Sequence, residues 1–383
     1  DSYSVRGVTM VASSASSVAC FDYYASVSST SSVSSSSSTS SSSKSSSSDD
    51  IATNGGPNSG AVYIFKETES GWKHEAHIKA SDAFPKDGFG VSIDLSFNGD
   101  TLAVGAIGAE EIVLNSSSSS VKASMTLEID GNKFSAREYL NSGAVYIFKR
   151  TESWQESSKI IPVNQGWEQS FGFALSLSDD GKTLAVGVPG DWSIAAGTTG
   201  SPTNYTTEGE IKLDSDYRIY YIDPKFNVAR DKSSFTSGAV YVYKHSDTSN
   251  TWVQEGYLKA SNPQTGYQFG SNLALSGSGD VLAVGCYIES SLASGINGDQ
   301  LDTSSTNSGA AYVFKRSAST WTQQSYVKAP NNNANDRFGR ALFLDFTGDI
   351  LAIGAYREAS KAVGINGDKS DNSVSAAGAI YIY

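Results

Sequence analysis

The feature that most constrains the fold is a motif that recurs along the chain. The eight residues SGAVYIFK at 59–66 return unchanged at 142–149. Close variants, SGAVYVYK and SGAAYVFK, occupy 237–244 and 308–315, and a shorter copy, AGAIYIY, occupies 377–383. Repetition of this kind is typical of arrays of one supersecondary unit, in which neighbouring units bury each other's apolar faces. The chain is therefore expected to contain five such units.

Two further motifs keep a fixed distance from each other. Phe89-Gly90 begins a segment that ends at Gly105, 16 positions after the Phe, and Trp72 lies 17 positions before Phe89. Both distances hold in four repeats, whereas the segment from the closing Gly to the Gly of the next SGAV motif measures 38, 51, 24 and 24 positions. Fixed spacing indicates packed structure, and variable spacing indicates a surface loop. The other members are Phe171, Gly187 and Trp154; Phe269, Gly285 and Trp252; and Phe338, Gly354 and Trp321.

Each fixed motif predicts a β-strand. FGVSIDLS alternates apolar and smaller or polar residues, which is the period of a strand, and AVYIF is dense in β-branched and aromatic residues. Asn98-Gly99-Asp100 between two such runs predicts a hairpin turn. The Trp motif also alternates, which places Trp72, His74, Ala76 and Ile78 on one face. The prediction is an all-β fold, a β-propeller of four-stranded antiparallel blades with five repeats visible.

One domain, 1–383, is predicted, because no shift in composition marks a boundary. The first repeat is degenerate: on spacing alone, residues 7–13 are expected to take the place of the Phe-Gly strand and 17–21 that of the LAVGA strand. The serine-rich segment 28–48 is interpreted either as a flexible, O-glycosylated linker or as serine written in place of unidentified side chains. The predicted blades cover about 1–80, 81–162, 163–261, 262–330 and 331–383.

The last repeat is expected to be incomplete. Earlier repeats reach a Trp strand 11 to 14 positions after the SGAV Gly, so that strand would come near position 390. A three-stranded blade leaves a row of unpaired backbone groups at its edge. Two explanations are open: the natural polypeptide continues, or a strand from a neighbouring molecule completes the blade.

Composition narrows the class of partner. The net charge of -12 argues against nucleic acid, and no run of about 18 apolar residues predicts a membrane span. No signal peptide precedes Asp1, which favours a processed or partial chain. Cys20 and Cys286 would lie in blades that are not neighbours, so two buried free thiols are predicted rather than a disulfide.

Phe171-Gly172 followed by Gly187-Val188-Pro189, and Phe89-Gly90 followed by Gly105-Ala106, resemble FG-GAP repeats. Such repeats form the propeller of integrin α-subunits and, closer in style, occur many times over in bacterial and algal surface proteins. The resemblance covers roughly 51–383 and implies an extracellular or cell-surface location. Integrin blades often bind calcium in a nine-residue loop between these strands. Here the hairpin is too short to supply the roughly six to eight oxygens that calcium takes, so those sites are not carried over.

No cofactor is predicted, with one alternative. GINGDQLD at 295–302 and GINGDKSD at 364–371 place side-chain oxygens at short spacing, which would suit Ca²⁺, or equally a turn whose acids face water. The candidate ligands are Asn297, Asp299 and Asp302 in the first loop and Asn366, Asp368 and Asp371 in the second.

An enzyme is not predicted. The chain has three histidines, and His74 and His77 are expected on opposite faces of one strand. No nucleophile elbow, zinc-binding helix or phosphate loop occurs. A glycosidase built from loop carboxylates is the remaining enzymatic alternative.

The leading hypothesis is an extracellular binding or adhesion module that uses propeller-face loops to bind a protein or glycan. The alternative is a structural subunit of an extracellular filament, appendage or coat, which binds copies of itself. The longest insertion, 188–236, carries residue types common at interface hot spots, or else packs on its own propeller. Its candidates are Trp192, Tyr205, Tyr217, Arg218, Tyr220 and Tyr221, and Asn115 and Asn204 are predicted N-glycosylation sites.

Overall fold

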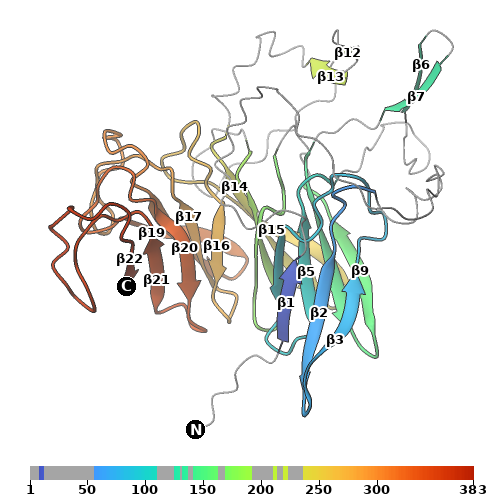
Figure 1. The fold of residues 1–383 in the computed structure, drawn as a ribbon, viewed down its shortest axis with the longest axis horizontal. Coiled ribbons are helices and arrows are strands. Elements are labelled where there is room, and N and C mark those ends of the chain that lie inside the picture. Colours follow the sequence, from blue (N-terminus) through green and yellow to red (C-terminus); the bar gives the residue numbers. More distant parts are fainter. Residues whose placement is uncertain are drawn as a thin grey trace, which may run out of the picture.

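The computed structural model describes residues 8–12, 56–109, 125–129, 132–136, 141–162, 169–191, 210–213, 219–222 and 236–383. All regular structure in these ranges is β-strand (Figure 1). The three middle repeats form four-stranded antiparallel sheets whose strands pair in chain order. This confirms the predicted all-β fold of propeller blades.

The strand bounds follow the motifs. The second sheet contains β4 (Ser92–Leu95), β5 (Thr101–Ala106), β8 (Ala144–Arg150) and β9 (Trp154–Ile160). The third contains β10 (Ala174–Leu177), β11 (Thr183–Val188), β14 (Ala239–Ser246) and β15 (Thr251–Leu258). The fourth contains β16 (Asn272–Leu275), β17 (Val281–Cys286), β18 (Ala310–Ser317) and β19 (Thr320–Val327).

The first and last sheets have three described strands each. The first contains β1 (Val8–Ala12), β2 (Val62–Thr68) and β3 (Gly71–Ile78). The last contains β20 (Phe338–Leu344), β21 (Leu351–Ala355) and β22 (Ala379–Ile382). No strand of the described residues pairs with the outer edge of β22, as expected for an incomplete repeat.

The placement of β1 corrects the expectation for the N-terminal segment. β1 pairs directly with β2, with Met10 opposite Ile64. Ile147 of β8 occupies the same motif position as Ile64 of β2. In the second sheet it lies opposite Ala103 of β5, the LAVGA strand. Residues 8–12 therefore take the place of the second strand, not of the Phe-Gly strand, because backbone pairing with β2 decides the position. The predicted strand at 17–21 lies outside the described residues.

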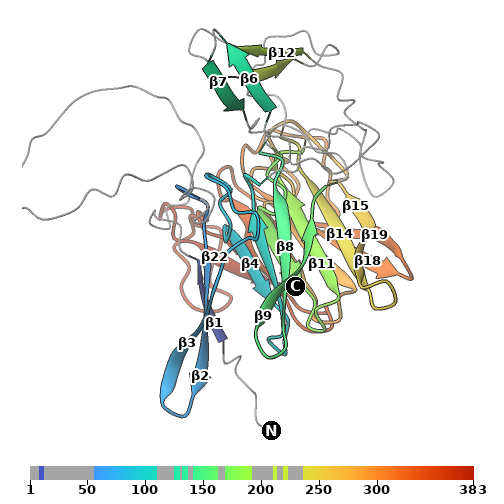
Figure 2. The same cartoon turned by 90° about the vertical axis from the view of Figure 1, so that its right-hand side faces the viewer.

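Consecutive sheets pack face to face in chain order. The inner strands contact one another, β4 with β10, β10 with β16, and β16 with β20. Every residue of β5, β11 and β17 is buried, because a sheet covers each face of these strands. Phe171, just before β10, shares a buried cluster with Val145 of the second sheet, and its ring centroid lies 5.6 Å from that of Tyr241 in the third. Figure 2 shows the sheets standing side by side.

The glycines of the motifs allow this close approach. Gly143 of one repeat forms a backbone bridge with Phe171 of the next. Its φ is +86°, and a Cβ at this position would lie 2.1 Å from the carbonyl oxygen of Phe171. No side chain fits there, so the Gly of SGAV is required by the contact between neighbouring sheets. The same bridge recurs at Gly60, Gly238 and Gly309.

In each sheet with a described outer strand, a β-bulge interrupts that strand. In β3 the pairing shifts between Ile64 and Phe65, which leaves Glu75 as the extra residue. His74 and His77 consequently both contact the ring of Tyr63, at centroid distances of 6.1 and 4.7 Å. The prediction that they face opposite sides was wrong, because it assumed an unbroken period of two.

The bulge also aims an acid at the next sheet. Glu75 forms an ion pair with Arg150 at 2.9 Å, and Arg150 also forms an ion pair with Asp100 in the hairpin turn. Two repeats later, Arg316 joins the bulge residue Glu255 and the hairpin residue Asp280 in the same way. The repeated insertion therefore links neighbouring sheets.

Candidate functional site

The variable loops emerge at one end of the sheets. β5, β11, β17 and β21 all run toward this end, and the SGAV strands start from it. Two further hairpins, β6 (Met125–Ile129) with β7 (Asn132–Ala136) and β12 (Glu210–Leu213) with β13 (Ile219–Ile222), lie beyond it in both views (Figures 1 and 2). We call this end the loop face.

Below the loop face, a buried lysine pairs with a buried acid. In the fourth sheet, the Nζ of Lys328 lies 2.7 Å from an oxygen of Glu289 and donates to Ser308, also at 2.7 Å. In the third, Lys259 pairs with Asp191 at 3.0 Å and donates to Ser237. All four charged side chains are fully buried.

The acid comes from the start of a variable loop, and the lysine follows the outer strand. Each ion pair therefore links the start of a variable loop to the end of the outer strand in the same sheet. Burial lowers the pKa of both lysines, which the neighbouring carboxylates oppose. Charged pairs this deeply buried are sustained by further hydrogen bonds: Glu289 also accepts from the Tyr326 hydroxyl and the Asn262 amide. These clusters organise the loop face.

The last sheet also has a buried acid in this position, Glu358, but no lysine of the described residues pairs with it. Glu358 is 1% exposed, and its two oxygens accept from Asn331 Nδ2 at 2.9 Å and Ser360 Oγ at 2.8 Å. Among the described residues no lysine or arginine lies within ion-pair distance of it. Asp336 is also buried nearby, and burial, together with the charge of Glu358, raises the pKa of its carboxyl to about 6.

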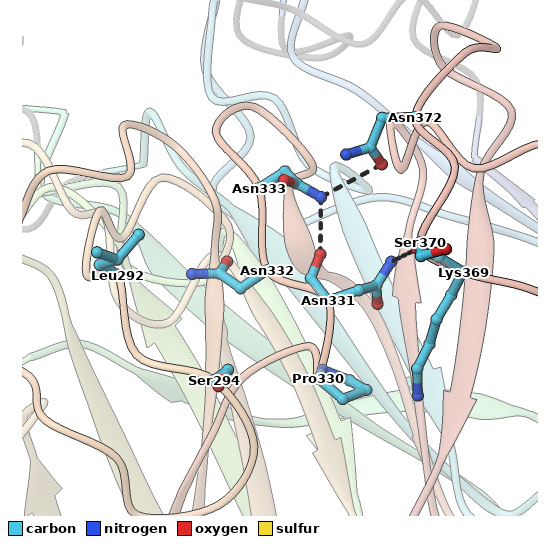
Figure 3. A pocket seen from close by; sticks show the side chains of 9 residues that line it. All are labelled: Leu292, Ser294, Pro330, Asn331, Asn332, Asn333, Lys369, Ser370 and Asn372. Carbon is cyan, nitrogen blue, oxygen red and sulfur yellow. Dashed lines mark hydrogen bonds between the residues drawn. The ribbon is translucent and has the colours of Figure 1, made fainter.

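A polar pocket of about 340 Å³ opens on the loop face between the fourth and fifth sheets (Figure 3). The run Asn331–Asn333 follows β19 and forms its floor, and Asn372 comes from the loop after β21. Asn333 Nδ2 donates to the carbonyl of Asn331 at 2.8 Å and to Asn372 Oδ1 at 3.4 Å. Asn332 Nδ2 donates to the backbone carbonyls of Ser291 and Ala293, while its buried Oδ1 has no partner among the described residues. The remaining lining residues are Leu292, Ser294, Pro330, Lys369 and Ser370.

This pocket was not predicted from the sequence. Its signal would have been the asparagine run after the fourth outer strand, since amides outside regular structure are free to present donors and acceptors. The variable loop that supplies the other wall has no fixed spacing to that run.

The geometry gives no support to a calcium site in the GINGD loops. Asp299 and Asp302 accept hydrogen bonds from the backbone of Leu301 and Ser304, and Asp368 and Asp371 do the same for Ser370 and Ser373. These are the turns that Asp commonly makes with its own backbone. No group of three acids, histidines or cysteines that could hold a metal occurs in the described part of the chain.

The other GINGD candidates serve the backbone. Asn297 and Asn366 have positive φ values of 55° and 57°. The Oδ1 of Asn297 accepts from the backbone N–H of Tyr326 in β19. The first GINGD loop therefore lies along the outer strand of its own sheet.

Several predicted residues lie outside the described ranges: Trp192, Tyr205, Tyr217, Arg218, Asn115, Asn204 and Cys20. Tyr220 and Tyr221 belong to β13, whose pairing with β12 is described but whose side chains are not. Cys286 is buried and free, and its thiol donates to the carbonyl of Tyr267. Burial raises the pKa of this thiol.

Comparison with known families identifies the repeat. The model of the FG-GAP repeat matches residues 72–124 and 252–314. The chain carries FG-GAP repeats. Each matched segment begins in the Trp strand of one sheet and continues through the Phe-Gly and LAVG strands of the next, so the FG-GAP unit is offset by one strand from the four-stranded sheet.

Other comparisons add little to the FG-GAP assignment. No curated protein matches the chain. A periplasmic gluconolactonase of Pseudomonas aeruginosa, PpgL, is similar at 12% identity over 78% of this chain and 73% of its own, with a TM-score of 0.31. Sqt1 of Chaetomium thermophilum is similar at 13% identity over 86% of this chain and 70% of its own, with a TM-score of 0.33. Likenesses of this size carry no argument, so the fold rests on the strand pairing. No helix in the described part of the chain is long and apolar enough to cross a membrane.

Proposed function

We propose that this FG-GAP protein is a non-enzymatic binding module of the cell surface, and that the pocket between its fourth and fifth sheets binds a hydroxyl-rich ligand such as a glycan. The carrying observation is the lining of that pocket. Four amides line it, and the Nδ2 groups of Asn331, Asn332 and Asn333 donate within the protein. The Oδ1 of Asn333 and the Nδ2 of Asn372 supply an acceptor and a donor for the hydroxyls of a sugar. Leu292 and Pro330 add apolar surface beside them.

The same lining argues against the glycosidase alternative at this site. Glycoside hydrolysis normally uses two carboxylates that flank the scissile bond. Its lining consists of amides, serines, one lysine and two apolar residues, and no carboxylate of the described residues belongs to it. A ligand bound here would be held without being cleaved.

A glycan array followed by titration calorimetry tests the proposal. Asn333→Ala with Asn372→Ala removes the pair that meets across the pocket. If each lost hydrogen bond costs about 1 kcal/mol, affinity should fall on the order of tenfold or more. Gln155→Ala removes an exposed amide near the opposite end and should change nothing. Unchanged affinity in the double variant, or turnover of the bound glycan, would overturn the proposal.

A specific observation favours the assembly alternative as a second candidate. Ile380 and Ile382 of β22 are 74% and 67% exposed, whereas Val240 and Val242, their equivalents in the third sheet, are fully buried. An exposed apolar edge strand is a typical site of association between chains. Native mass spectrometry of the purified 383-residue chain should then show concentration-dependent oligomers, and a monomer at all concentrations would exclude this candidate.

A further inference from the structure

We propose that the fifth sheet is an acceptor for a β-strand that carries a lysine, and that Glu358 is the group that recognises this lysine. The inference deepens the assembly alternative and rests on it; it does not depend on glycan binding. The occupant is defined by its chemistry: an extended segment with an aromatic residue, an aliphatic residue and a lysine in succession. The argument compares the fifth sheet with the complete fourth sheet.

The fourth sheet shows the occupied form. There β19 pairs with β18 so that Val327 lies opposite Ala311 and Tyr326 opposite Tyr312. Lys328, the next residue, reaches Glu289, and the Tyr326 hydroxyl donates to the same carboxylate at 2.9 Å. Tyr326 and Val327 of the outer strand therefore supply the backbone pairing, and Tyr326 and the following Lys328 each contact the same buried acid.

The fifth sheet repeats the inner part of this arrangement. Phe338 packs against Tyr381 and Tyr383 at 5.4 and 6.3 Å, as Phe269 packs against Tyr312 and Phe314 at 5.2 and 6.0 Å. Tyr381 donates to Asn331 at 2.6 Å, as Tyr312 donates to Asn262. β22 is thus in the position of β18, with its outer edge unpaired among the described residues.

The carboxylate of this sheet, Glu358, is buried, and no lysine or arginine of the described residues forms an ion pair with it. Asn331 holds one oxygen of Glu358, as Asn262 holds one oxygen of Glu289. Ser360 donates to the other oxygen; its equivalent, Ser291, instead contacts the Tyr326 hydroxyl. A buried carboxylate without a cation is costly, and the second buried acid, Asp336, adds to the unbalanced negative charge. An incoming ammonium group would neutralise it.

The neighbouring loop is already shaped for the strand. In the fourth sheet, Asn297 N donates to Tyr326 O at 2.7 Å, and the backbone N–H of Lys328 donates to Gly295 O at 2.8 Å. In the fifth, Gly364 and Asn366 have nearly the same φ values, 73° and 57° against 71° and 55°. Ile365 between them is 93% exposed, whereas Ile296, which bridges to Val327, is 57% exposed. The loop keeps its strand-binding conformation although no described strand is bound.

The chain itself supplies the probe: a synthetic peptide of residues 320–330, TWTQQSYVKAP, which is β19 with its lysine. Fluorescence anisotropy would measure its binding to the 383-residue chain, and hydrogen exchange would locate it. We expect saturable binding, slower exchange at 379–383, and at least tenfold weaker binding of the peptide with Lys328→Met. Glu358→Gln in the protein should remove this difference, whereas Glu69→Gln, at an exposed acid in the first sheet, should preserve it.

The outcomes separate the parts of the inference. No binding of the native peptide up to millimolar concentration would refute the acceptor edge, and with it the assembly route through β22. Binding that is equal for the lysine and methionine peptides would refute recognition by Glu358 while leaving the edge intact. If Glu358→Gln lowers the melting temperature, Asn366→Ala provides a second test, because it removes a contact with the incoming strand and leaves the acid in place. Unchanged peptide affinity in the Asn366→Ala variant would contradict the preformed loop.

Discussion

Replacing Lys328 with methionine should destabilise the fourth sheet strongly. Lys328 and Glu289 are both fully buried, and their charged atoms lie 2.7 Å apart. Methionine fills much of the same volume but leaves the carboxylate without a cation. Removal of one partner of a buried pair costs about 3–5 kcal/mol. Glu289 retains hydrogen bonds from Tyr326, Asn262 and the backbone of Ser291, so we expect the lower end, about 3 kcal/mol.

Two variants make the measurement decisive. Lys182→Met removes an ion pair with Asp247 whose side chains are 42% and 64% exposed, and should cost far less stability than Lys328→Met because solvent screens the pair. Lys328→Met combined with Glu289→Gln removes both charges and should recover most of the loss. The assay is urea unfolding, with hydrogen exchange of β18 and β19 to locate the effect. A loss for Lys328→Met no larger than for Lys182→Met, or a double variant no more stable than the single one, would refute the reasoning.

Three further predictions follow from other contacts. Gly238→Ala should cost several kcal/mol more than Gly266→Ala in urea unfolding, because both have φ near +84° but only the Cβ at Gly238 would lie 2.1 Å from Phe269 O; equal losses would contradict the close-approach argument. Burial raises the pKa of Asp336 from 3.8 to about 6 in the folded protein, so its contribution to stability is present below pH 3.8 and lost as the pH rises through 6. Asp336→Asn should therefore raise the melting temperature at pH 8 and lose that advantage near pH 4. A difference in melting temperature that does not depend on pH would argue against this reasoning. Chelation of calcium should leave the melting temperature unchanged, because the acids of the GINGD loops serve their own turns; a fall of several degrees that Asp299→Ala or Asp368→Ala abolishes would restore the calcium hypothesis.

The repeat, the strands and the hairpins could be predicted from the sequence because each depends on residues close together in the chain. Asn98-Gly99 predicts its turn locally, and Gly99 indeed has a φ of +73°. The AVYIF motif predicts a strand covered on both sides, and β8 is buried from Ala144 to Phe148.

What depends on contacts between distant segments was decided only by the tertiary structure. The bulge at Glu75 moved His74 to the face of His77, because pairing with β2 rather than residue type sets the register. Pairing with β2 likewise moved β1 to the second position in its sheet. Glu289 and Lys328 are 39 residues apart and belong to a loop of variable length and an outer strand. No local pattern brings such groups together; pairing of the strands and stacking of the sheets do, and they thereby create the buried acids and the amide pocket.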